Sequence, residues 1–460
     1  MPTLSKYLSE NLDAFDADLF ELLRIPSVST DSRHAADVRR GAEWVAGQFQ
    51  AMGLAHEVIE GDGHPIVYAE SPPVEGAPIA LVYGHYDVQP PDPLDEWVSP
   101  PFEPTVRDGN VFARGATDDK GQMLTHVFST RAHLATEGKL PLQLKFIIEG
   151  EEEVGSSVLQ KYLAKEHDRL ACDCVVISDC SQFAAGQPAI TYGLRGICYC
   201  EVRLVGPKQD LHSGVFGGAV SNPATTLAKL LASLADAEGR VQGPGFYDDV
   251  ENLTDREREQ FQALPFSERR FMDQIGVEGL SGESGYSTLE RRWARPAFDV
   301  HGLWSGYQGE GQKTVLPATA GAKFSFRLVP NQDPAKVVES LEPFLRDQLP
   351  PGIRLELDAA HSAHGFVVPL DSPFMSAAVR AIETGFGRPP VFIREGGSIP
   401  IVSQFAEHLG ADVLLLGWGR DDDNTHSPNE KFSLADFHRG IKASAALWGE
   451  LAKIKPGTTG

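Results

Sequence analysis

The chain has 460 residues, and its 64 Asp and Glu outnumber 41 Lys and Arg to give a formal net charge of −23 with neutral His. This length exceeds the roughly 100–200 residues of an ordinary domain, and the acidic balance argues against nucleic acid, a partner that requires clustered basic residues. The composition, 42% hydrophobic and 23% charged, is typical of a globular protein, and no apolar run approaches the roughly 20 residues that cross a bilayer.

The amino-terminal part predicts helices followed by buried strands. Apolar residues recur at helical spacing over 5–23, and a second helix is expected over 36–52, before Gly53. Continuous apolar runs then lie at 79–83, 142–148, 174–177 and 413–416, with helical stretches such as 121–137 between them. Strands buried on both faces of a parallel sheet have this composition, so the alternation predicts an α/β domain.

The middle of the chain has a different pattern. Residues 196–205 and 321–329 alternate apolar and polar side chains, which is typical of a sheet with one solvated face. Helices are expected over 224–237 and 335–348, and a last strand over 353–357. This order predicts a ferredoxin-like α+β unit. We therefore expect a mostly parallel α/β domain covered by helices, formed by 1–192 and 366–460, with an α+β domain inserted at 193–365.

The five cysteines indicate a reducing compartment. They are Cys172, Cys174, Cys180, Cys198 and Cys200, an odd number without a C-x-x-C pair. Cys172 and Cys174 lie in an apolar run and Cys198 and Cys200 in an alternating one, where a free thiol behaves as a small buried hydrophobic group, so we interpret the cysteines as structural. The first ten residues also lack the apolar segment of a secretory signal. We expect a cytoplasmic protein without a disulfide framework.

Polar loops follow the predicted buried strands. His85 and Asp87 come after the first, residues 149–153 (EGEEE) after the second, Asp179 after the third, and a loop containing His426 after the last. A further polar loop, 113–121, precedes a helix. Ligand sites of open α/β sheets lie at the carboxyl ends of the strands, and His, Asp and Glu are the ligands of hydrolytic Zn or Mn sites. Each feature alone also fits a solvated turn or a helix cap, and we interpret Asp422-Asp423-Asn424 as a solvated loop.

These loops resemble the M20 family of co-catalytic metallopeptidases, within it the branch of cytosolic nonspecific dipeptidases and carnosinases. The matching stretches run in family order over nearly the whole chain: 84–90 (GHYDVQP), 114–121 (RGATDDKG), 149–156 (EGEEEVGS), 190–196 (ITYGLRG), 210–214 (DLHSG), 326–330 (FRLVP), 395–400 (EGGSIP) and 426–430 (HSPNE).

The resemblance implies two divalent ions per subunit, Zn²⁺ or Mn²⁺, bridged by Asp118 and a water. His85 and Asp179 would hold one ion, and Glu153 and His426 the other. Glu152 would be the general base, and Asp87 would orient His85. The sequence Val154-Gly155-Ser156 sets the alignment of the three glutamates in favour of Glu152 and Glu153. The family also implies a cis peptide bond between Asp118 and Asp119.

Substrate-binding residues follow from the same resemblance. Arg327 would bind the substrate carboxylate, a role that suits a bidentate guanidinium. His212 would enter the neighbouring subunit's site and stabilise the oxyanion. His364, Thr314 and Ser398 would be further contacts. The inserted domain would then act as lid and dimer interface, which makes the chain a homodimer.

The predicted function is metal-dependent hydrolysis of dipeptides or short unblocked peptides. An N-acyl-amino-acid amidohydrolase would use the same metals and base, so a small N-acyl amino acid is the alternative substrate. A non-catalytic binding protein on the same fold is the alternative from another class. That class predicts a missing ligand or base, and none is missing from the sequence.

Overall fold

The computed structural model describes residues 2–397 and 399–457, which form two compact units. Unit 1 comprises Met1–Tyr192, Val368–Ile393 and Gln404–Gly460, and unit 2 comprises Gly193–Val367 and Arg394–Ser403. Residues 366–367 and 394–403, predicted to belong to the catalytic domain, thus group with the inserted part. The lid and dimerisation roles of that part stay predictions. No helix within the described ranges is long and apolar enough to cross a membrane.

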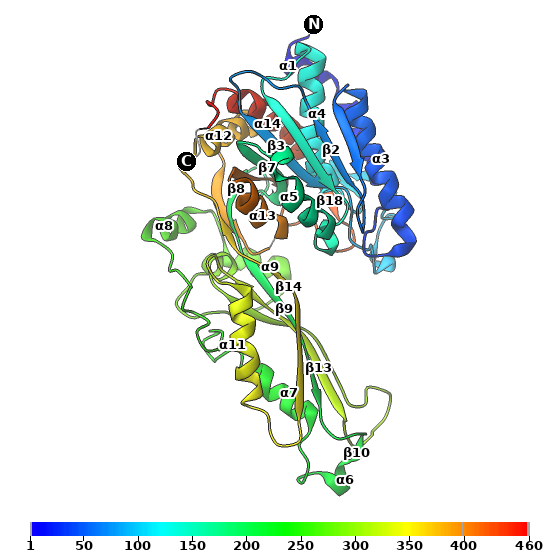
Figure 1. The fold of residues 1–460 in the computed structure, drawn as a ribbon, viewed down its shortest axis with the longest axis vertical. Coiled ribbons are helices and arrows are strands. Elements are labelled where there is room, and N and C mark those ends of the chain that lie inside the picture. Colours follow the sequence, from blue (N-terminus) through cyan, green and yellow to red (C-terminus); the bar gives the residue numbers. More distant parts are fainter. Residues whose placement is uncertain (1, 398, 458–460) are drawn as a thin grey trace. The chain divides into compact units, whose positions relative to one another are not determined.

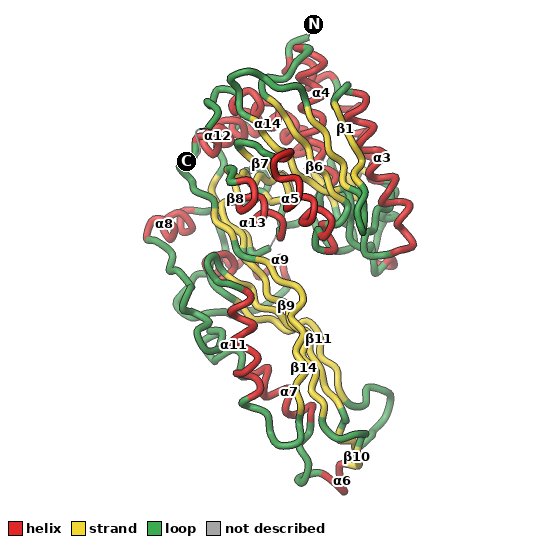
Figure 2. The backbone as a smooth tube through the Cα atoms, in the orientation of Figure 1, coloured by secondary structure: helices red, strands yellow, loops and turns green. Residues whose placement is uncertain are grey.

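Unit 1 is built on a twisted sheet whose central strands are parallel (Figures 1 and 2). Among the described residues the strand order is β1-β2-β6-β3-β7-β17-β8, with β6, β3, β7 and β17 parallel and the flanking pairs antiparallel. These strands are β1 (Ala55–Ile59), β2 (Ile66–Glu70), β3 (Ile79–His85), β6 (Gln143–Glu149), β7 (Cys174–Ser181), β8 (Ala189–Leu194) and β17 (Asp412–Gly419). β8 continues into unit 2, where its last residues pair with β15 (Phe366–Val367), and β16 (Val391–Glu395) also pairs with β8. The predicted fold class is confirmed.

Helices cover both faces of this sheet. Gly84 of β3 faces Met123 of α4, whereas its neighbour Tyr83 stacks edge-on against Phe405 of α13, and successive strand residues point to opposite faces. The helices are α1 (Leu4–Glu10), α2 (Leu12–Leu23), α3 (Ala35–Ala51), α4 (Lys120–Glu137), α5 (Ser157–Leu170), α12 (Pro373–Phe386), α13 (Pro400–Leu409) and α14 (Leu434–Leu451), with short 3₁₀ turns η1 (Ser32–His34), η2 (Leu94–Glu96) and η3 (Glu152–Val154). A small sheet of β4 (Thr105–Arg107), β5 (Asn110–Phe112) and β18 (Lys431–Ser433) joins distant segments.

Unit 2 has the predicted α+β order. Its antiparallel sheet runs β11-β13-β9-β14, and apolar residues of β9 and β13 form a core with α7 and α11. The elements are β9 (Gly196–Val205), β10 (Leu211–His212), α6 (Ser213–Phe216), α7 (Pro223–Ala232), α8 (Asp255–Ala263), α9 (Glu268–Ile275), α10 (Thr288–Trp293), β11 (Ala297–Ser305), β12 (Val315–Leu316), β13 (Thr319–Leu328), α11 (Pro334–Arg346) and β14 (Arg354–Ala363).

Two predicted helices differ from the structure. The first is divided at Asn11, whose backbone leaves the helical region and whose amide donates to the carbonyl of Tyr7 at 2.8 Å. The second, expected to reach residue 237, ends at Ala232 because the Ser233 hydroxyl bonds the carbonyl of Leu230, and a turn organised by Asp236 follows. In both cases a short polar side chain competes with the helical hydrogen bonds.

A buried histidine in unit 1 makes stability depend on pH. His126 of α4 lies between the hydroxyls of Ser444 (2.8 Å) and Ser178 (2.7 Å), and burial lowers its pKa to about 3. Because this value is below the ordinary 6.5, the unfolded chain binds a proton that the folded chain does not, so stability declines as the pH falls from 6.5 toward 3. Urea unfolding of metal-free protein should show that His126→Gln loses ~2 kcal/mol less than the wild type between pH 7 and pH 5, and equal losses would contradict this account.

Candidate metal centre

Three adjacent parallel strands bring polar side chains to one edge of the sheet of unit 1. β3 ends at His85, β6 leads into the 3₁₀ turn with Glu152 and Glu153, and β7 carries Asp179 near its end. The loop after β17 carries His426, and the loop before α4 carries Asp118. The carboxyl ends of parallel strands are the usual place for such a site.

The predicted ligands form two clusters that share one residue. His85 Nε2 lies 3.1 Å from Asp118 Oδ1 and 4.0 Å from Asp179 Oδ2. His426 Nε2 lies 2.9 Å from Asp118 Oδ2 and 3.3 Å from Glu153 Oε2. Within each cluster the potential ligand atoms all lie within 4.8 Å of one another. Asp118 therefore turns one carboxylate oxygen toward each cluster, which is the arrangement of a bridging ligand.

The chemistry of this donor set fits divalent cations. His85 Nε2 is fully buried and makes no hydrogen bond to a described residue. Burial, together with the negative charges of Asp119 and Asp118, raises the pKa of Asp179 well above its ordinary value. Carboxylates crowded in this way stay ionised when cations compensate them, and a mixed imidazole and carboxylate set suits Zn or Mn. The peptide bond between Asp118 and Asp119 is cis, as the resemblance implies.

Asp87 contacts both the predicted ligand His85 and the 3₁₀ turn that carries Glu152 and Glu153. His85 Nδ1 lies 3.1 Å from the backbone carbonyl of Asp87 and 3.4 Å from its carboxylate. The two carboxylate oxygens accept the backbone N–H groups of Glu152 (3.3 Å) and Glu153 (3.2 Å). The sequence predicts contact with His85 but not this second role, in which the carboxylate holds the 3₁₀ turn that presents the two glutamates.

The three consecutive glutamates have distinct surroundings. Glu151 accepts the N–H groups of His64 and Val158, both at 2.9 Å, and thus ties a loop to the start of α5. Burial raises the pKa of Glu152 above its ordinary value, to about 8. Glu153 lies against His426, whereas Glu151 belongs to neither ligand cluster. The roles predicted for Glu152 and Glu153 stay predictions.

Sequence reasoning missed two buried acids in the loop that carries His426. Asp423, interpreted as part of a solvated loop, is fully buried and accepts the Thr117 hydroxyl at 3.0 Å. The interpretation holds for Asp422 and Asn424, which are exposed, but is wrong for Asp423, whose carboxylate also accepts the backbone N–H of Arg420 at 2.8 Å. Glu430, which belongs to a matching stretch but received no role, is also fully buried. A buried carboxylate requires partners, but nothing local in the sequence signals the burial.

Four of the predicted substrate contacts, namely His212, Thr314, Arg327 and His364, lie in unit 2. His212 and Thr314 are neighbours, because β10 pairs with β12 and the Ser213 N–H donates to the Thr314 carbonyl at 3.1 Å. Arg327, half-buried on β13, lies opposite Ile197 of β9, and Ala363, next to His364, lies on the other side of Ile197. Ser398 falls outside the described residues. These residues thus form two pairs, His212 with Thr314 and Arg327 with His364, at opposite ends of the antiparallel sheet of unit 2.

Together the fold and the clustered ligands define a metal-dependent hydrolase. Residues 81–450 match Peptidase family M20/M25/M40, and the chain belongs to this family. It is 34% identical to the Cys-Gly metallodipeptidase dug1 of Schizosaccharomyces pombe over 98% of both chains, and 36% identical to the Beta-Ala-His dipeptidase of Homo sapiens over 85% of this chain and 78% of that one. The crystal structure of human carnosine dipeptidase 1 superposes with a TM-score of 0.87 at 33% identity, covering 99% of this chain and 100% of that chain. The predicted family and enzyme class are confirmed.

Proposed function

We propose that the chain hydrolyses the peptide bond of dipeptides with two divalent metal ions, Zn²⁺ or Mn²⁺. The observation that carries this proposal is the pair of ligand clusters that share Asp118. The curated relatives named above are dipeptidases, which supports the substrate class. His85, Asp118 and Asp179 would hold one ion, and Asp118, Glu153 and His426 the other. Bound ions of this kind lower the pKa of a shared water and polarise the scissile carbonyl.

Glu152 supplies the proton transfers in this proposal. Its buried carboxylate accepts a proton from the attacking water and returns it to the nitrogen of the leaving amine. The Asp87 carboxylate holds the backbone of Glu152 and so orients this base. None of the five cysteines forms a disulfide within the part of the chain that the structure describes, which supports a cytoplasmic location.

Arg327 binds the free carboxylate of the dipeptide in this proposal. Replacing it by Met should raise KM for dipeptides about 10-fold to 100-fold, because a hydrogen-bonded charged pair contributes ~1.5–3 kcal/mol. Dipeptide amides, which lack that carboxylate, should be cleaved equally by the variant and the wild type. Lys323→Met removes a positive charge from the same strand and is the matched control. A similar rise in KM for the amides would contradict the assignment.

Unit 2 supports a site shared between two subunits. Arg327 lies eight positions after Thr319 on β13, a distance of ~26 Å along the strand, and the His212 and Thr314 pair lies beyond the Thr319 end (Figure 1). A dipeptide spans only ~7 Å. Arg327 and His212 can therefore contact one substrate only if they come from different copies of the chain, which is why we propose a homodimer.

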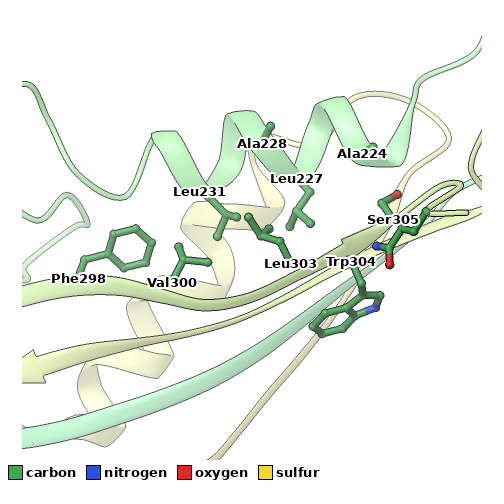
Figure 3. A pocket seen from close by; sticks show the side chains of 10 residues that line it. Ala224, Leu227, Ala228, Leu231, Phe298, Val300, Leu303, Trp304 and Ser305 are labelled. Atoms are coloured by element: carbon green, nitrogen blue, oxygen red, sulfur yellow. The ribbon is translucent and has the colours of Figure 1, made fainter. Parts of the chain in front are cut away.

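The edge of unit 2 offers a surface for that dimer. A pocket of about 640 Å³ lies between α7 and the edge strand β11, and Figure 3 shows Leu227, Leu231 and Leu303 turned toward it. The side chain of Leu303 is 61% exposed, and Val300 beside it is 39% exposed. Exposed apolar groups on an unpaired sheet edge favour association, and a second copy of the same face is the partner we propose.

The proposed function is tested by a substrate panel on metal-reconstituted protein. Dipeptides, tripeptides and N-acyl amino acids would be assayed with Zn²⁺, Mn²⁺ and Co²⁺ after the metal-free protein has been prepared with a chelator. We expect the highest kcat/KM for dipeptides with a free amino group. Preference for N-acyl amino acids would favour the amidohydrolase alternative, and metal binding without turnover of any substrate would favour the binding-protein alternative.

A further inference from the structure

The Glu430 side chain is buried beneath the loop that carries Asp118. Its Oε1 accepts the backbone N–H groups of Thr117 (3.0 Å) and Asp118 (3.2 Å). Its Oε2 accepts the N–H of Gly115 (2.9 Å) and an N–H of the Arg114 guanidinium (2.8 Å). A carboxylate has about four acceptor positions, and all four are used here within a single loop.

Other contacts join the same two segments. The Ala113 N–H donates to the Glu430 carbonyl at 3.1 Å, and the Thr117 hydroxyl donates to the Lys431 carbonyl at 2.7 Å. Asp423, which precedes His426 in the chain, accepts a hydrogen bond from the same Thr117 hydroxyl. The segments 113–118 and 423–431 are therefore held together at several points, although about 300 residues separate them in the chain.

The charge of Glu430 is compensated within this arrangement. Arg114 is itself only 1% exposed, and its second terminal nitrogen donates to the Pro90 carbonyl at 3.1 Å. Gly115 adopts φ +80, and a Cβ there would come within 2.5 Å of a methyl group of Val88, so the loop reaches Glu430 in a conformation that glycine permits. The loop is thus shaped around a carboxylate.

We propose that Glu430 is a positioning residue that fixes Asp118 relative to His426 and so sets the affinity of the shared metal site. Four residues along the chain from His426, it contacts the backbone N–H of Asp118, and it therefore links the two loops that supply these ligands. The inference rests on the proposed function because it takes both residues as metal ligands. A side chain that orients a ligand typically changes metal affinity or activity by 10-fold to 100-fold when it is replaced.

Glu430→Gln is the main test. An amide has one acceptor oxygen and directs its NH₂ group at N–H donors, so one pair of the four hydrogen bonds is lost. We expect metal-free protein to bind Zn²⁺ and Mn²⁺ 10-fold to 100-fold more weakly, measured by calorimetric titration and by competition with a chromogenic chelator. At saturating metal, kcat should fall while KM stays unchanged, because substrate-binding residues are untouched.

Glu283→Gln is the matched control for the loss of a buried ion pair. Glu283 accepts two hydrogen bonds from Arg295 in unit 2, at 2.7 and 2.8 Å, and both side chains are almost fully buried. This variant should lose stability without losing metal affinity. Wild-type metal affinity in folded Glu430→Gln, or an equal loss of affinity in Glu283→Gln, would overturn the inference.

A second variant covers the case in which Glu430→Gln does not fold. Glu430→Asp keeps the charge but withdraws the carboxylate by one methylene, so it should fold and weaken metal binding in the same direction. Wild-type affinity in this variant would overturn the inference. Failure of the wild-type chain to take up metal would instead overturn the proposed function, which keeps the two outcomes distinct.

Discussion

Replacing Glu152 by Gln should lower kcat for dipeptides by about 10²-fold to 10⁴-fold while both metal sites remain filled. The amide keeps the size and the buried position of the side chain but cannot accept a proton from the attacking water. Because Glu152 belongs to neither ligand cluster, the variant should retain the metal affinity of the wild type. Single-turnover kinetics and metal analysis of the purified variant provide the two measurements.

The neighbouring Glu151→Gln is the control for this experiment. Its carboxylate accepts two backbone N–H groups away from the ligand clusters, so its replacement should lower the melting temperature more than kcat. The pair of variants therefore also tests the alignment of the three glutamates. Full activity in Glu152→Gln, combined with loss of turnover in Glu151→Gln, would move the base by one residue.

The central strands of unit 1 were predictable because their signal is local. A run such as 174–177 is apolar without interruption, short and rich in β-branched residues, which is typical of a strand covered on both faces. Once such strands are placed, the residues that follow them meet at one edge, and this places His85 and Asp179 together. The contribution of Asp118 was harder to predict from strand positions, since its loop precedes a helix; the resemblance to the family supplied it.

What the sequence could not predict depends on contacts between distant segments. Asp423 lies in a loop with the composition of a solvated segment, but its carboxylate is buried and accepts the hydroxyl of Thr117, about 300 residues away, which no local pattern predicts. Glu151 and Glu152 are identical in type and adjacent, and they differ because the carboxylate of Glu151 accepts the backbone N–H groups of His64 and Val158. Such roles are decided by tertiary partners, which no local pattern encodes.

Mixing two inactive variants should restore activity if each site is shared between subunits. His212→Ala alone should reduce kcat by about 10²-fold to 10³-fold without changing metal content, because it removes one group that stabilises the oxyanion. Glu152→Gln is inactive for a different reason. In a heterodimer of the two, one site combines the intact Glu152 of one copy with the intact His212 of the other, so it regains every residue proposed for catalysis.

The size of the recovery follows from the statistics of assembly. When equal amounts of the two variants exchange subunits, about half of the dimers are mixed, and one of the two sites in each is complete, so about a quarter of wild-type activity should return. Mixing His212→Ala with Asp118→Asn should give the same recovery, since Asp118 lies in the same cluster as the metal ligands of its own copy. If exchange is demonstrated by size-exclusion chromatography of tagged subunits and activity stays at the level of the separate variants, His212 acts within its own subunit or not at all.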